Sequence, residues 1–153
     1  MNLIKAIFSV AALICFLAVL ARGQQPLQTQ AHDTVEGVEV DLVSIEVQNN
    51  IVTAKFRIRN TGTDKQSVVF NFGRCYIMDE TNQKKYYPLK DSDGLFIAGP
   101  MYDNSDGGRF WYDVDKGKSK AFWVKFPQPA DNPAAVTISI PAVSPFESVK
   151  LAK

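Results

Sequence analysis

Apolar residues recur at every second position through most of the chain after residue 34, the spacing of β-strands with one buried face. The clearest run covers residues 52–59. Two sets of side chains alternate there, with Val52, Ala54, Phe56 and Ile58 on one face and Thr53, Lys55, Arg57 and Arg59 on the other. We therefore predict a strand whose first set enters a core and whose second set faces water.

The preceding run, residues 38–47, also alternates, but its parity changes part-way. Apolar residues occupy even positions up to Leu42 and odd positions from Ile45. One extra residue near Val43-Ser44 would return both halves to a single buried face, so we predict a β-bulge or a crossing between sheets there. Residues 48–50 read Gln-Asn-Asn, and asparagine suits the positive φ of a tight turn. The two runs should therefore form an antiparallel hairpin.

Further strand-like runs follow at residues 67–78, with a break at Gly73, and at residues 84–89, 110–114, 120–126, 136–140 and 147–151. Turn residues separate these runs, and none has the 3.6-residue apolar period of a helix. About seven to nine short strands of this kind predict an all-β fold, an immunoglobulin-like antiparallel β-sandwich. The Cys-Trp-Cys pattern of antibody domains is absent, so the likeness concerns architecture.

The N-terminus has the features of a secretory signal peptide. Lys5 precedes an uncharged run over residues 6–20, which ends in the small-residue pattern Val19-Leu20-Ala21. This run is shorter than the roughly twenty residues that span a bilayer, so a retained anchor is the alternative. We expect a signal helix over residues 1–21, a flexible glutamine-rich tether over 22–34 and one domain over 35–153. The protein should be exported, periplasmic or secreted, with no membrane span after cleavage.

The net charge and the cysteine content limit which binding partners and which thiol chemistry the protein can have. The chain has 17 Lys and Arg residues against 16 Asp and Glu, a formal net charge of +1, which disfavours nucleic-acid binding. Cys15 lies in the predicted signal peptide, so Cys75 is the one cysteine of the mature chain. We predict that Cys75 is a buried thiol, with a reactive thiol or an intermolecular disulfide as alternatives.

Three segments resemble a family of exported bacterial immunoglobulin-like domains of unknown function, related in fold to a secreted mycobacterial antigen. The first is Arg59-Asn60-Thr61-Gly62 at the end of a strand, and the second is Asp79-Glu80 followed by Lys84-Lys85-Tyr86-Tyr87. The third is the turn at residues 115–119 followed by Phe122-Trp123-Val124-Lys125-Phe126-Pro127. The resemblance covers roughly residues 38–151, with residues 91–108 as an insertion. It implies a β-sandwich outside the cytoplasm and no catalytic residues.

The sequence contains no recognisable catalytic motif. Its one histidine, His32, lies in the predicted tether. This position argues against most catalytic arrangements that pair a nucleophile with a histidine, and a zinc site is implausible with one remote histidine and one cysteine. Six aspartates between residues 91 and 115, including Asp103 and Asp106, offer oxygen ligands for calcium, but EF-hand spacing is not met and aspartate is an ordinary turn residue. We therefore predict that the protein is not an enzyme and has no cofactor, with calcium binding and a small hydrolase as alternatives.

The two tryptophans provide the sharpest binding hypothesis. If residues 110–114 and 120–126 pair as a hairpin around Lys116-Gly117, Trp111 and Trp123 both stand on one outer face. Exposed aromatic residues on a sheet bind proteins or stack against sugar rings, whereas a covering loop over residues 91–108 would make them a second small core. We predict a non-catalytic binding or structural module that contacts protein, with a carbohydrate-binding module as the alternative. The candidate ligand-binding residues are Trp111, Trp123, Asp103 and Asp106. The sequence does not indicate an oligomeric state.

Overall fold

The structure, a computed structural model, describes residues 25–151, and within this range the protein is all-β. It has eleven strands in antiparallel sheets: β1 (Gln28–Ala31), β2 (Val38–Gln48), β3 (Ile51–Asn60), β4 (Gln66–Asn71), β5 (Tyr76–Asp79), β6 (Lys84–Tyr86), β7 (Ala98–Gly99), β8 (Arg109–Val114), β9 (Ser119–Pro127), β10 (Ala135–Ser139) and β11 (Phe146–Lys150). Two single 3₁₀ turns, η1 (Phe72–Arg74) and η2 (Ser105–Gly107), interrupt them. Over residues 25–151 we find no helix of the length and apolarity that a bilayer crossing requires. The predicted signal peptide lies outside the described residues.

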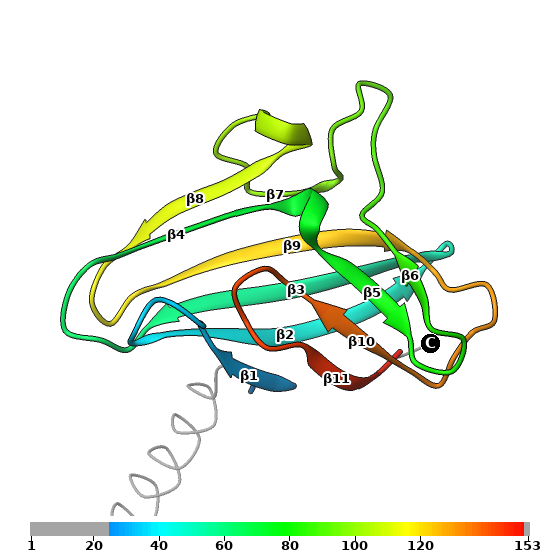
Figure 1. The fold of residues 1–153 in the computed structure, drawn as a ribbon, viewed down its shortest axis with the longest axis horizontal. Coiled ribbons are helices and arrows are strands. Elements are labelled where there is room, and N and C mark those ends of the chain that lie inside the picture. The colour runs from blue at the N-terminus through cyan, green and yellow to red at the C-terminus, as the bar shows by residue number, and fades with distance from the viewer. Residues whose placement is uncertain (1–24, 152–153) are drawn as a thin grey trace, which may run out of the picture.

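The strands form three sheets that share one core (Figure 1). A five-stranded sheet has the order β1-β2-β3-β9-β7, a four-stranded sheet the order β11-β10-β5-β6, and β4 pairs with β8 alone. Phe122 on β9 lies 5.3 Å from Phe110 on β8, and Phe56 on β3 lies 5.8 Å from Phe146 on β11, measured between ring centroids. The β4–β8 ribbon and the four-stranded sheet therefore both cover the inner face of the five-stranded sheet.

The first hairpin confirms the predictions made from the apolar pattern. The four β3 side chains predicted to face the core, those of Val52, Ala54, Phe56 and Ile58, are at most 1% exposed. The register between β2 and β3 shifts between Leu42 and Ser44, so the β-bulge occurs at Val43. Asn49 and Asn50 both adopt positive φ, 52° and 60°, in the connecting turn. This turn matches the right-handed twist of the strands that it joins.

Two predicted loops contain strands. Within the expected tether, residues 28–31 form β1, which pairs with β2, so this part is not a free linker. Gln28 and Gln30 donate side-chain hydrogen bonds to the main-chain oxygens of Glu147 and Pro145, at 2.7 and 3.1 Å. The sequence shows no alternation here because β1 seals a sheet edge with polar side chains. Residues 91–108 likewise contain β7, which pairs with β9.

Polar residues of β2 and β3 form a cluster on the outer face of the five-stranded sheet. The Asp41 side chain is fully buried and accepts hydrogen bonds from Arg57, Arg59 and Thr29. The shortest of these are the 2.7 Å bonds from Nε of Arg59 and from the Thr29 hydroxyl. Burial alone would raise the pKa of Asp41, but the bonds from these three residues outweigh it and lower the pKa to about 2. Arg57 and Arg59 therefore face outward, as predicted, but are partners of a buried carboxylate and only a third exposed.

The segment Asn60-Thr61-Gly62 joins three parts of the fold. The Asn60 side chain is buried and donates to the main-chain oxygens of Asp64 and Val114, at 2.7 and 2.8 Å. Gly37 adopts a φ of +75°, and a Cβ atom there would lie 2.6 Å from the Cα of Gly62. Glycine at both positions thus permits a close contact between the turn before β2 and the end of β3.

Cys75 is a buried free thiol, as predicted. It directly follows η1, at the point where the chain leaves β4 and enters β5. Burial raises the pKa of this thiol, which disfavours the reactive thiolate form. Its surroundings are those of a small core hydrophobe.

Candidate functional site

The two tryptophans lie on opposite faces of the molecule, so the prediction of a shared face is wrong. β8 pairs with β4, whereas β9 pairs with β3 and β7, and the expected β8–β9 hairpin does not form. Phe110 and Phe122 point inward and meet in the core. Trp111 and Trp123 follow them directly, and since side chains alternate along a strand, each indole points away from the core on its own side.

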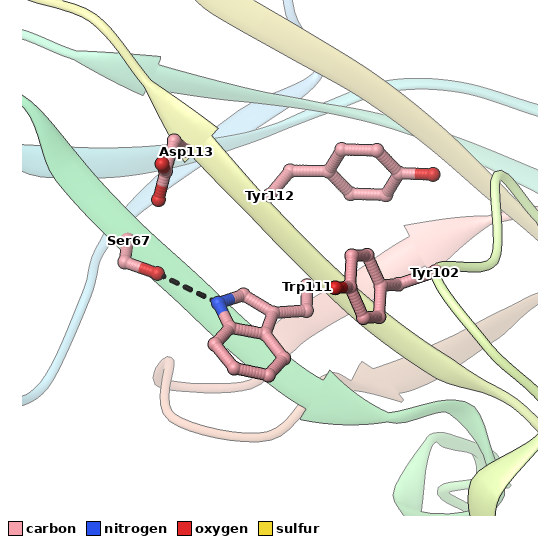
Figure 2. A pocket seen from close by; sticks show the side chains of 5 residues that line it. All are labelled: Ser67, Tyr102, Trp111, Tyr112 and Asp113. Atoms are coloured by element: carbon pink, nitrogen blue, oxygen red, sulfur yellow. Dashed lines mark hydrogen bonds between the residues drawn. The ribbon is translucent and has the colours of Figure 1, made fainter.

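Trp111 lies at the centre of an exposed aromatic surface on the β4–β8 ribbon (Figure 2). Its indole nitrogen donates a 3.0 Å hydrogen bond to the Ser67 hydroxyl on β4. Val69 is its cross-strand partner, and the Tyr102 ring lies 5.2 Å away between centroids. We call Val69, Tyr102 and Trp111 the aromatic face; they are 52%, 58% and 42% exposed. These fractions are high for large apolar side chains, and three such residues are adjacent here.

The loop before β8 holds Tyr102 against this face. The Tyr102 N–H donates to the Arg109 carbonyl at 2.7 Å, and the Arg109 N–H donates to the Asp103 carbonyl at 2.9 Å. The Arg109 guanidinium contacts the Asp103 carboxylate and lies 5.0 Å from the Trp111 ring centroid. The Ser105 N–H and Arg109 lower the pKa of Asp103, so this carboxylate is ionised at neutral pH. Asp103 therefore positions the loop beside Trp111.

A shallow pocket of about 400 Å³ lies beside the aromatic face, lined by Ser67, Tyr102, Trp111, Tyr112 and Asp113. The Tyr112 hydroxyl donates to the Met101 carbonyl at 3.1 Å, which ties the ring to the loop. The Lys120 ammonium lies 4.1 Å from the centroid of the same ring. Asp113 forms a 2.6 Å ion pair with Lys65. The pocket thus has aromatic walls, and the Lys120 ammonium contacts the ring of one of them, Tyr112.

Trp123 has different surroundings and belongs to the five-stranded sheet. Its indole rests on Gly99 of β7, where a Cβ atom would come within 3.2 Å of the ring. The long side chains of β3 lean away toward β2, since Lys55 pairs with Glu46 and Arg57 with Asp41. A groove of about 310 Å³ remains over Ala121 between the two groups. Trp123 is 37% exposed, so the loop over residues 91–108 covers it only in part.

The aspartates predicted as ligands do not come together as a set. Asp103 lies beside the aromatic face, whereas Asp106 adopts a φ of 51° in η2. The Asp91 carboxylate accepts the main-chain N–H groups of Asp93 and Leu95, as turn aspartates do. Within residues 25–151, no group of three or more His, Cys, Asp or Glu side chains is arranged to hold a metal ion.

His32 is not a free tether residue. It forms an isolated antiparallel bridge with Val143, and its Nδ1 atom accepts the main-chain N–H groups of Thr34 and Val35. Burial lowers its pKa, and the nearby Asp33 opposes that shift. These contacts give His32 a structural role at the start of the domain.

Tyr102, Ser67 and Arg109 were not among the residues selected from the sequence. Strand alternation does indicate that Ser67, Arg109 and Trp111 point outward. The missing information was that β4, and not β9, is the neighbour of β8. Tyr102 lies in a loop, where the sequence contains no periodic signal.

Comparisons with known proteins give structural relatives alone. No protein-family profile and no curated protein sequence matches the chain. Among solved structures, the yjhA protein from Bacillus subtilis is similar, with a TM-score of 0.50 and 12% identity over 85% of this chain and 100% of that chain. A functionally unknown protein from Listeria monocytogenes EGD-e has a TM-score of 0.41 and 12% identity over 81% of this chain and 87% of that chain. The fold is thus similar to that of a bacterial protein.

Proposed function

We propose that this protein is an exported, non-catalytic module that binds another protein in the cell envelope or extracellular space. In this proposal the fold is an immunoglobulin-like β-sandwich and the chain belongs with the exported family that it resembles. The observation that supports binding is the aromatic face, where Val69, Tyr102 and Trp111 are adjacent and each more than 40% exposed. Protein interfaces are enriched in aromatic residues and arginine, and Arg109 lies against Trp111.

The aromatic face is also held in place before any partner binds. Ser67 holds the Trp111 indole, and the main-chain pairing with Arg109 holds Tyr102. A rigid surface loses little side-chain entropy on association, which favours affinity. Carbohydrate binding is the second candidate, and its support is reduced because Trp123 faces the opposite side. A single Trp111–Tyr102 pair, tilted by 48°, would have to receive the sugar.

Site-specific photo-cross-linking in the native host tests the proposal. A benzophenone amino acid at Val69 should give a discrete protein adduct on illumination, identifiable by mass spectrometry, and Trp111→Ala should abolish it. The same probe at Lys150, an exposed residue on β11, is the matched control. Equal adducts at both positions, or none at Val69, would contradict protein binding. Tryptophan fluorescence of the purified protein with soluble xylan and chitin oligomers tests the second candidate, which requires a shift that Trp111→Ala removes.

A further inference from the structure

The edge of β8 that faces away from β4 is only partly paired. Arg109 exchanges hydrogen bonds with Tyr102 and Asp103 on this edge, so the loop acts as a very short added strand. Main-chain groups on one side of a strand recur at every second residue. The N–H and C=O groups of Trp111 and Asp113 therefore face the same side as those of Arg109. Those of Phe110 and Tyr112 face β4.

No further strand covers this edge in the part of the chain that the structure describes. Between residues 25 and 151, β8 pairs with β4 and forms one isolated bridge, Asp103 to Arg109. No bridge joins residues 98–101 to β8, and a pocket of about 400 Å³ lies beside Trp111 and Asp113 (Figure 2). An uncovered strand edge beside a pocket is the geometry that a partner strand uses when it adds to a sheet.

The side chains around the edge indicate what such a strand would contain. A residue opposite Trp111 would point to the outer side, over the Trp111 and Tyr102 rings, which suits an apolar side chain. Its neighbour would point to the side of Tyr112, where the Lys120 ammonium lies. A carboxylate is the complementary group at that position. Asp113 does not repel it strongly, because Lys65 pairs with Asp113 at 2.6 Å.

We propose that the partner protein contributes an extended segment that pairs with β8 at Trp111 and Asp113 and continues the short strand formed by Tyr102 and Asp103. The segment has an apolar residue over Trp111 and an acidic residue next to it that faces Lys120. This inference rests on the proposed function and specifies how its site binds. Main-chain hydrogen bonds provide affinity in this mode, and the two side chains provide specificity.

A random peptide-display library selected on the purified full domain tests this mode. The decisive pair of variants is Asp113→Pro and Asp113→Ala. Both remove the carboxylate, but only proline also removes the N–H that faces the pocket, and that N–H is not part of the β4 ladder. We expect the enriched peptides to bind Asp113→Ala within about threefold of wild type. Their affinity for Asp113→Pro should fall about tenfold, the effect of one main-chain hydrogen bond.

A charge reversal gives a second readout that does not depend on the proline variant. Selection on wild type should enrich an acidic residue next to an apolar one, and selection on Lys120→Glu should enrich a basic residue at that place. Thermal melts confirm that each variant folds. Absence of enrichment, equal binding to the proline and alanine variants, or an unchanged preference on Lys120→Glu would overturn the inference.

The outcomes separate this inference from the proposed function. A cross-link at Val69 together with no effect of Asp113→Pro on peptide binding would retain the interaction site and reject strand addition. Absence of any protein cross-link at Val69 in the wild-type background would reject the interaction site itself. If the wild-type protein forms dimers as its concentration rises and Asp113→Pro does not, a second copy of this chain occupies the edge. That result would overturn the proposal that a segment of another protein binds there.

Discussion

At the scale of single residues, Phe56 lies at the centre of the aromatic core. It is 1% exposed, and its ring stacks on Phe122 at 4.8 Å between centroids. We predict that Phe56→Ala lowers the free energy of unfolding by roughly 3–5 kcal/mol. The next residue, Arg57, faces outward but bonds to Asp41, so Arg57→Ala should cost about 1 kcal/mol, more than an ordinary surface change. Denaturant melts of both variants measure this, and equal losses would contradict the assignment of faces.

Asp41 should make stability depend on pH in acid. Its pKa is about 2 in the folded protein, below the ordinary value of 3.8, so the ionised carboxylate stabilises the fold above about pH 4. This contribution, about 2 kcal/mol, is lost as the pH falls from about 4 to 2. We therefore predict that the free energy of unfolding falls less over that range in Asp41→Asn than in wild type. Asp113→Asn is the control, since Asp113 is half exposed on its ion pair. Parallel pH profiles for wild type and Asp41→Asn would contradict the prediction.

At the scale of secondary structure, β1 acts as a seal on the edge of β2. It covers Asp41 through Thr29, contacts β11 through the bond from Gln28 to Glu147, and contacts the residue before β11 through the bond from Gln30 to Pro145. We predict that a chain that starts at His32 melts roughly 5–10 °C below one that starts at Leu27, because the first lacks β1 and the second keeps it. The exposed edge of β2 should also promote self-association, measurable by size-exclusion chromatography. Equal melting temperatures and equal elution would show that β1 adds nothing to the fold.

The elements also show where sequence reasoning succeeds. Alternation in β3 and the parity change at Val43 report directly which side of a strand is buried, so the first hairpin and its bulge are predictable. β1 and β7 lack such a signal, because the first is polar and the second has two residues. Alternation also indicates that Trp111 and Trp123 both point outward. Alternation does not specify which strand lies next to β8, because strand pairing depends on contacts between residues distant in sequence. The pairing of β8 with β4 instead of β9 determines which residues surround Trp111.

At the scale of the whole molecule, the two outer faces have different chemistry. The five-stranded sheet presents ion pairs from β2 and β3 with Trp123 beside them, while the β4–β8 ribbon presents the aromatic face. The loop over residues 91–108 contacts both sides, since Gly99 supports Trp123 and Tyr102 lies against Trp111. The loop thus forms one rim of the candidate site and also contains the edge strand β7. A partner that binds at Trp111 would therefore contact the segment that the resemblance treats as an insertion.

The proposed export of the protein gives a last prediction, on where its mature chain begins. Residues 22–27 separate the expected cleavage site after Ala21 from the first residue of β1, Gln28. Six residues extend to at most about 20 Å, so a retained anchor would hold the domain close to the membrane. We predict that the exported protein instead begins at Arg22, because the apolar run is short and ends in small residues. N-terminal sequencing of the periplasmic or secreted fraction measures this. Ala21→Phe should block cleavage and keep the protein with the membrane, whereas Gly23→Ala should not. Recovery of wild-type protein with an intact Met1 in the membrane fraction would contradict cleavage and favour the anchor.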